Sequence, residues 1–287
     1  MPQTGFHCIV DFVDVPFENC IDCAATRGRC QFTASILRGM VEQAHGRAPD
    51  APNSVSVTTL TGCGRQAYLK ETEAFSQRPD QQYWAYRGTL AHAMVERGAG
   101  DDAIIERRFA RELRLPSGRA ITITGRPDEI VPARTLLVEY KTTDRPPKVP
   151  AVQHVAQMNA YRWLVAPEYP VERLGLVYLT MRGVHKASAP IWPEEQVERF
   201  LGERAAELVR ARETGEWPSL TEDTWMCSYC PVAEVCKRGQ LPAGPVLADG
   251  RADAPAEPGP TARPDDAEPD DLDEWDPAER GELAAAR

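Results

Sequence analysis

The amino-acid sequence predicts a mixed α/β domain, in which helices flank a mixed central sheet. Two features of the 287 residues lead to this prediction. Segments with helical capping signals and helical periodicity are interspersed with short strand-like runs bounded by turn residues. In addition, a hydrophobic fraction of 42% is enough to bury the core of one large domain or two small ones.

The predicted elements follow in the order helix, helix, three strands, helix, strand, helix, which is typical of helices packed on a sheet. Thr58 or Thr59 can cap the first helix, and Gly98 is a plausible stop for the second. A Pro-Ser-Gly turn at 116–118 separates the first two strands. The expected helices cover residues 60–70, 85–96, 151–165 and 194–213, and the expected strands cover residues 104–115, 121–130, 136–141 and 174–181.

Charge and composition divide the chain into three parts. Residues 1–50 form an N-terminal cysteine-rich module, and residues 51–241 form the main domain. Residues 242–287 hold 13 acidic residues against 4 arginines, so we expect a disordered acidic tail. The remaining chain has 30 acidic and 29 basic residues and is almost neutral, so it could carry a local basic groove. The candidates are Arg107, Arg108, Arg111, Arg114, Arg119 and Arg126, although a solvated hairpin explains any one of them equally well.

The sequence has no apolar run of membrane-spanning length and no signal-peptide pattern at its start. We therefore expect a cytoplasmic protein without membrane association. The eight cysteines include two Cys-x-x-Cys pairs, which in such a chain indicate metal ligation rather than disulfides.

The motif with the clearest chemistry lies in the middle of the chain. Asp128 precedes a strand that carries Glu139 and Lys141, and residues two apart on a strand share one face. If the Asp128 segment pairs beside that strand, two carboxylates and an ammonium group meet at one point. Two carboxylates suit Mg²⁺ or Mn²⁺, and the lysine can assist a water in attacking a phosphate.

Two sets of cysteines have spacings that suit metals. Cys63, Cys227, Cys230 and Cys236 supply four thiolates, enough for a [4Fe–4S] cluster or a zinc ion, and the residue chemistry alone does not separate the two. Cys8, Cys20, Cys23 and Cys30 suit a small structural zinc site, for which His7 is a substitute ligand.

Four short motifs in sequence order make the chain resemble the RecB-type PD-(D/E)xK nucleases. More narrowly, it resembles the CRISPR-associated iron–sulfur exonucleases and the nuclease domain of the AddB helicase subunit, over roughly residues 55–240. The N-terminal module does not match this family. The motifs are Gly88-Thr89-Leu90-Ala91-His92, Gly125-x-x-Asp128, Glu139-x-Lys141 and Gln157-x-x-x-Tyr161.

The resemblance implies a restriction-endonuclease-like core and a set of roles. His92, Asp128, Glu139 and the backbone carbonyl of Tyr140 would bind Mg²⁺ or Mn²⁺. Lys141, Gln157 and Tyr161 would complete the catalytic site, although Tyr161 also fits a core aromatic. The one-early, three-late cysteine pattern is typical of the iron–sulfur members, so the resemblance favours a [4Fe–4S] cluster on Cys63, Cys227, Cys230 and Cys236.

The function these features predict is a metal-dependent deoxyribonuclease that acts on single-stranded DNA or DNA ends. Its partners would be DNA and either a CRISPR integrase or recombination proteins. Trimming DNA for CRISPR spacer acquisition is one setting, and stand-alone repair or phage recombination is another. A non-catalytic DNA-binding or scaffold protein of the same fold is the alternative from a different class, which the intact set of polar residues disfavours.

Overall fold

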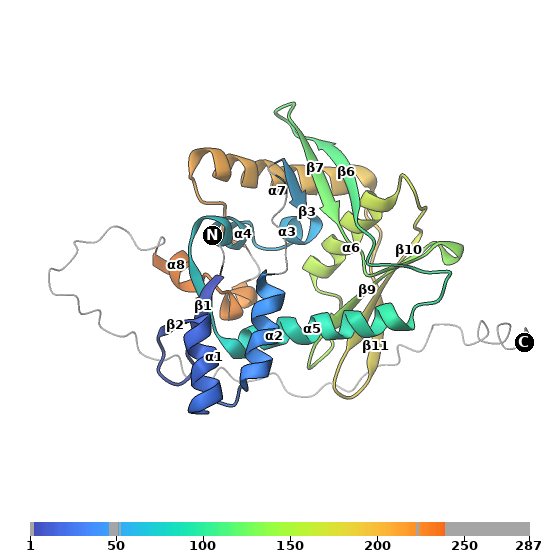
Figure 1. Ribbon diagram of the computed structural model, residues 1–287. Coiled ribbons are helices and arrows are strands. Elements are labelled where there is room, and N and C mark those ends of the chain that lie inside the picture. The colour runs from blue at the N-terminus through green and yellow to red at the C-terminus, as the bar shows by residue number, and fades with distance from the viewer. Residues whose placement is uncertain (1–2, 46–50, 52, 222–223, 239–287) are drawn as a thin grey trace, which may run out of the picture. The chain divides into compact units, whose positions relative to one another are not determined.

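The computed structural model describes residues 3–45, 51, 53–221 and 224–238, shown in Figure 1. The helices are α1 (Phe17–Thr26), α2 (Ala34–His45), α3 (Val57–Thr61), α4 (Gly64–Thr72), α5 (Pro79–Gly98), α6 (Val152–Val165), α7 (Glu194–Thr214) and α8 (Ala233–Arg238), with 3₁₀ turns at Pro132–Arg134 and Thr224–Tyr229. The strands are β1 (Gln3–His7), β2 (Asp14–Pro16), β3 (Ser54–Ser56), β4 (Phe75–Gln77), β5 (Ile104–Ile105), β6 (Phe109–Arg114), β7 (Ala120–Gly125), β8 (Glu129–Val131), β9 (Leu136–Thr142), β10 (Arg173–Leu179) and β11 (Val184–Ser188). The tail predicted to be disordered, residues 242–287, lies outside the described residues.

The main sheet has five strands in the order β11-β10-β9-β8-β5. β9 and β10 run parallel, and all other neighbours are antiparallel. The parallel pair requires a crossover, which α6 provides. The fold is therefore mixed α/β, as predicted, with β9 at the centre of its sheet.

A second sheet has the order β3-β7-β6, in which β7 pairs antiparallel with β6 and parallel with β3. Figure 1 shows the long β6–β7 hairpin extending beyond the main sheet. A third sheet, β2-β1-β4, joins the N-terminal segment to the main domain, because β1 pairs parallel with β4.

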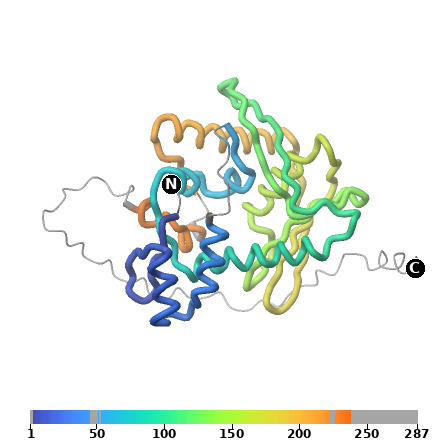
Figure 2. The backbone as a smooth tube through the Cα atoms, viewed as in Figure 1, coloured from blue at the N-terminus to red at the C-terminus, as the bar shows by residue number. Residues whose placement is uncertain are grey.

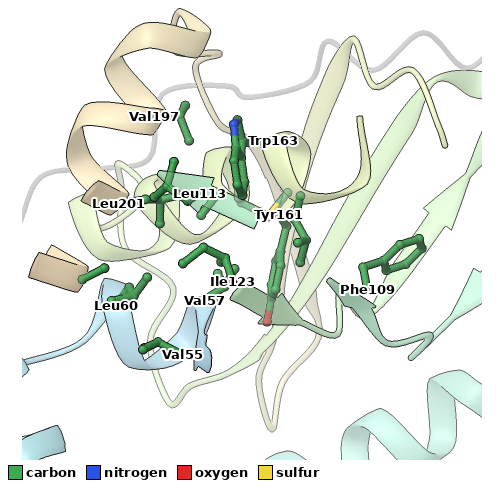
Figure 3. Close-up of a cluster of buried hydrophobic side chains, with 14 of the residues drawn as sticks. Val55, Val57, Leu60, Phe109, Leu113, Ile123, Tyr161, Trp163, Val197 and Leu201 are labelled. Carbon is green, nitrogen blue, oxygen red and sulfur yellow. The ribbon is translucent and has the colours of Figure 1, made fainter. Parts of the chain in front are cut away.

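Helix α6 lies in the middle of the core and contacts both larger sheets as well as α3 and α7. From Val155 to Val165 the helix is buried at all but one position, which explains its lack of an amphipathic pattern. Figure 3 shows Tyr161 and Trp163 of this helix among apolar side chains from β6, β7, α3 and α7.

Four of the predicted elements differ in the structure. The helix predicted at 85–96 begins six residues earlier, at Pro79. The first helix begins earlier and is broken: Ser56 caps α3, its Oγ accepting the Thr59 N–H at 3.1 Å, and the chain turns at Gly62 and Cys63 before α4. The strand predicted at 104–115 is interrupted at Glu106, whose φ is 49°. The strand predicted at 121–130 divides into β7 and β8, which lie in different sheets.

Helix α5 connects the N-terminal segment with the main sheet, as the chain path in Figure 2 shows. It packs against α2 near its start and against β9 farther along. The buried Gln82 amide donates to the Met40 carbonyl at 2.8 Å and accepts from the Gln3 side chain at 2.8 Å. Within the described part of the chain, no helix combines the length and apolar character needed to cross a bilayer.

Candidate active site

The predicted site residues come from separate elements that meet at β9, the central strand of the main sheet. His92 lies on α5, Asp128 immediately precedes β8, and Glu139, Tyr140 and Lys141 follow one another on β9. Gln157 and Tyr161 lie one turn apart on α6. The pairing of β8 with β9 places the Asp128 segment beside the Glu139 strand, as the sequence predicted.

His92 lies between two carboxylates. Its Nδ1 is 3.2 Å from Asp128 Oδ1 and 3.0 Å from Glu106 Oε1. The ligand atoms of these three side chains all lie within 4.8 Å of one another. Two hydrogen bonds raise the pKa of His92 to about 10, and the bond to Asp128 has a larger effect than the bond to Glu106. The proton on His92 therefore compensates charge that a divalent cation would compensate when bound.

Asp128 is almost completely buried, at 5% exposure, and is held by the backbone of β9. Its Oδ2 accepts the Tyr140 N–H at 2.7 Å, while the Tyr140 hydroxyl donates to Glu129 at 2.5 Å. One Asp128 oxygen is thus fixed by the sheet, and the other faces His92. The role of the Tyr140 carbonyl as a metal ligand stays a prediction.

Glu139 and Lys141 share one face of β9, as expected from the alternation of the strand. Lys141 Nζ donates to Glu139 Oε1 at 2.8 Å, whereas Glu139 Oε2 is buried and has no hydrogen-bond partner. Burial raises the pKa of Glu139 to about 7, while Lys141 opposes this rise and Asp128 adds to it. A buried carboxylate oxygen without a partner is costly, and a cation at this point would satisfy it.

Gln157 and Tyr161 extend this arrangement into a chain of hydrogen bonds. Gln157 Oε1 accepts from Lys141 at 2.8 Å, and Gln157 Nε2 donates to the Tyr161 hydroxyl at 3.3 Å. The Tyr161 hydroxyl lies 3.4 Å from Thr58 Oγ1 of α3. Tyr161 thus contributes its ring to the core, and its hydroxyl bonds the same Gln157 that accepts from Lys141. Its part in catalysis stays a prediction.

Glu106 is a residue of this site that no sequence motif contains. Its local signal is weak, because it only follows the apolar pair Ile104-Ile105 and precedes two arginines. Its left-handed φ of 49° is unusual for a residue with a side chain. Its backbone N–H donates to the Asp128 carbonyl at 3.1 Å. The main chain of Glu106 is therefore bonded to Asp128, while its side chain contacts His92.

The arginines predicted as candidates for a basic groove do not form one free strip. Arg114 donates to the Gly118 carbonyl at 3.3 Å, and four others pair with carboxylates. These pairs connect the β6–β7 region to surrounding segments, so their first role is structural. The pairs are Arg107 with Glu168, Arg111 with Glu194, Arg119 with Glu213, and Arg126 with Glu106.

The early and late cysteines approach each other although they are far apart in the sequence. Cys63 caps α4, and its sulfur accepts the Gln66 N–H at 3.5 Å. The Gln66 side chain donates to Cys230 Sγ at 3.3 Å. Burial raises the pKa of Cys230, and the nearby Cys63 and Cys227 add to the rise. Cys236 follows on α8, which packs against α4.

This thiol set fits an iron–sulfur cluster in the kind and number of its ligands. Cysteines from two distant segments come near each other, since Gln66 bonds the sulfur atoms of both Cys63 and Cys230. The helix N-terminus at Cys63 favours a negative charge on that sulfur. Cys230 and Cys236 also pack against the core, so a group bound here would lie against the folded domain rather than on a loose loop.

Comparison with known proteins agrees with this architecture. The family model described as PD-(D/E)XK nuclease superfamily matches residues 100–237, which include every predicted catalytic residue from Asp128 to Tyr161. The resemblance to PD-(D/E)xK nucleases predicted from the motifs is therefore confirmed.

One similar protein is of the kind that the motifs predict. The CRISPR-associated exonuclease Cas4 of Saccharolobus solfataricus is 26% identical over 211 residues, which cover 71% of this chain and 96% of that protein. The crystal structure of SSO0001 aligns with a TM-score of 0.57 at 24% identity, over 71% of this chain and 95% of that one. The structural likeness shows that the two chains share a fold.

Proposed function

We propose that this chain is a Mg²⁺- or Mn²⁺-dependent DNA exonuclease that acts on single-stranded DNA or DNA ends. The observation that carries the proposal is the unpartnered, buried Glu139 Oε2 beside Lys141, in the same site as the His92, Glu106 and Asp128 group. Carboxylates and an imidazole in one partly buried site are ligands that suit these cations.

In this proposal His92, Asp128 and Glu139 hold the cation, and Glu106 is a further candidate ligand. When bound, Mg²⁺ or Mn²⁺ supplies Lewis-acid activation of the scissile phosphate and the attacking water. The buried position of Glu139 and Asp128 strengthens their attraction to the ion, because the surrounding dielectric is low.

Lys141 would act on the phosphate directly. An ammonium group has three N–H donors, and two of them are directed to Glu139 and Gln157. The third is available to a phosphate oxygen or to the attacking water. Gln157 and, through it, Tyr161 would fix the direction of that donor, so they are positioning residues in this scheme.

We further propose that the cleaved DNA is trimmed in a CRISPR setting, together with an integrase. The support for this is the similarity to the Saccharolobus protein, which is a CRISPR-associated exonuclease. Stand-alone repair or phage recombination uses the same chemistry. Trimming of DNA ends that a CRISPR integrase then accepts would distinguish the two settings.

Cys63, Cys227, Cys230 and Cys236 are proposed to hold a [4Fe–4S] cluster. When bound, the cluster would cross-link the start of α4 to the segment after α7. The shared Gln66, which bonds the sulfurs of both Cys63 and Cys230, supports this assignment.

The first prediction tests the metal site. Asp128→Asn and Lys141→Gln should each lower the rate of Mn²⁺-dependent DNA digestion at least about 100-fold, because each removes a charge that acts on the reacting phosphate. Thermal unfolding should show that both variants are folded. Asp101→Asn and Lys186→Gln are matched controls at exposed positions outside the site and should keep the wild-type rate.

Wild-type rates in either site variant would contradict the proposed site. DNA binding by the wild type without cleavage under any divalent cation would instead favour the non-catalytic alternative.

A further inference from the structure

The four N-terminal cysteines lie around one pocket. Cys8 follows β1, Cys20 and Cys23 lie on α1, and Cys30 lies between α1 and α2. All four are free thiols of intermediate burial. They line a single pocket of about 330 Å³, whose other lining residues include Asp11 and Arg29. The spacing of these cysteines is visible in the sequence, but their convergence on one pocket is visible only in the structure.

The four thiol groups share this one pocket, so any charge on one sulfur lies close to the other three. Four thiolates cannot occupy such a pocket without a compensating cation, because like charges repel and burial penalises each charge. A soft divalent metal removes this penalty, since it binds thiolates and displaces their protons.

The loop after Cys8 is fixed by hydrogen bonds to that cysteine. The Asp11 N–H donates to Cys8 Sγ at 3.4 Å, and the Cys8 main chain bonds Val13 O at 2.8 Å and Phe12 N at 3.0 Å. Phe12 is held in a left-handed conformation, with φ of 55°. A bulky residue adopts this conformation only where its surroundings impose it, often at ligand sites.

The two cysteine-bearing loops are joined directly across the pocket. Both Arg29 NH groups donate to Asp11, at 2.7 and 2.8 Å, in a bidentate ion pair. The segment leading to Arg29 turns away from α1 where the Cys23 carbonyl accepts from Arg27 and Gly28. Hydrogen bonds of this kind, made by residues next to the ligands, orient the ligands and increase the affinity for the metal.

We propose that this pocket is a structural zinc site, in which Cys8, Cys20, Cys23 and Cys30 bind one Zn²⁺ as thiolates. Four sulfur ligands are the donor set of a closed, tetrahedral structural zinc centre. His7 is not among the ligands, because it pairs with Asp14 at 2.9 Å and does not line the pocket. Among the described residues, no three of these sulfur atoms lie within 4.8 Å of one another, so zinc would draw the loops inward.

The small core of this module explains why it would need a metal. Its buried apolar cluster is much smaller than that of the main domain, and small cores are commonly supplemented by a metal. The same module contacts α5, the helix that carries His92, through Gln82. Zinc would therefore stabilise the module that packs against α5, and it would take no part in DNA cleavage. The buried residues of this cluster are Phe6, Phe17, Phe32, Leu37 and Met40.

The test is zinc and iron analysis of the full-length protein, produced in medium containing both metals. Wild type should contain one zinc per chain, Cys23→Ser should lose most of it, and the matched variant Cys227→Ser should keep it. Zinc content is read independently of DNA cleavage, so failure of this site and failure of the proposed nuclease are distinguishable. Wild type without zinc, zinc retained by Cys23→Ser, or iron lost from Cys23→Ser with zinc unchanged would each overturn the proposal.

Zinc-edge X-ray absorption of the wild type covers the case in which Cys23→Ser fails to fold. Four sulfur atoms at about 2.3 Å are expected around the zinc. A shell containing nitrogen or oxygen would overturn the four-thiolate assignment.

Arg29→Ala retains all four ligands but removes the ion pair with Asp11, so it should release zinc to a chelator several-fold faster than wild type. An unchanged rate would contradict the role of the Arg29–Asp11 pair in holding the zinc ligands.

Discussion

At the scale of single residues, the glycine of the Gly125-x-x-Asp128 motif has a steric reason that the sequence alone does not show. A Cβ at Gly125 would lie 2.7 Å from Tyr161 Cε1 and 2.8 Å from Leu164 Cδ2. These contacts are far too short, and both neighbours are buried. The motif thus keeps α6 close to β7, which places Gln157 within reach of Lys141.

We predict that Gly125→Ala lowers the free energy of unfolding by about 1–3 kcal/mol, because the added methyl group overpacks the core. Urea denaturation measures this directly. The matched control is Gly202→Ala on α7, where a Cβ meets nothing within 4 Å and the helix should gain about 0.5–1 kcal/mol. Equal effects of the two substitutions would show that the close packing at Gly125 is not the reason for the glycine.

His154 is a second residue whose role becomes clear only in the structure. Burial and, to a smaller extent, the charge of Lys141 lower the pKa of His154 to about 4. The imidazole is therefore neutral near pH 7, and its Nδ1 forms a hydrogen bond with the Tyr178 hydroxyl at 3.1 Å. A neutral ring so close to Lys141 avoids repulsion between two cations behind the site.

This depressed pKa predicts how stability depends on pH. Unfolded His154 takes up a proton near pH 6.5, whereas the folded residue does so near pH 4. Its contribution is therefore complete above about pH 6.5 and is lost as the pH falls toward 4, by up to about 3 kcal/mol. His154→Gln should lose less stability than wild type over this window in pH-dependent urea denaturation, and parallel curves would contradict the assignment.

At the scale of elements, the break between α3 and α4 is the clearest departure from the sequence prediction. Local helix signals continue from residue 58 to residue 70, so they predict one helix. The structure interrupts it at Gly62 and Cys63, where Arg204 of α7 donates to the carbonyls of Leu60 and Gly62. A distant side chain thus satisfies the end of α3 and leaves Cys63 to cap α4, which no local pattern can reveal.

If Cys63 ligates the proposed cluster, Arg204 positions that ligand. Arg204→Gln should lower iron content per chain and speed the loss of the brown colour in air, whereas Arg210→Gln, an exposed neighbour on α7, should behave as wild type. Cys230→Ser should remove the colour altogether. Wild-type iron content in Cys230→Ser would exclude the late cysteines as ligands.

At the scale of the whole molecule, the sequence predicted the order of the motifs and their convergence, because the period of β9 and the turn-like spacing on α6 are local properties. Asp128, Glu139, Lys141 and Gln157 could thus be grouped in advance. Glu106 could not, since its place beside His92 depends on the pairing of β5 with β8. The parallel pairing of β1 with β4 likewise joins distant segments through main-chain bonds that carry no sequence signal.

The N-terminal module shows the same limit from the other side. Its cysteine spacing suggested a metal. Only the folded chain shows that the module contacts α5, the helix that carries His92, through Gln82. The chain thus has three separate sites where metal chemistry is expected. They are the active site at β9, the late cysteines and the N-terminal pocket.

The most direct test of the central claim is anomalous diffraction from crystals soaked in Mn²⁺. The account predicts an anomalous peak in contact with Glu139, Asp128 and His92, with Glu139 Oε2 among the ligands, and no peak at this point in Asp128→Asn crystals. Mn²⁺ bound at a different place in a protein that still degrades DNA would contradict the proposed active site.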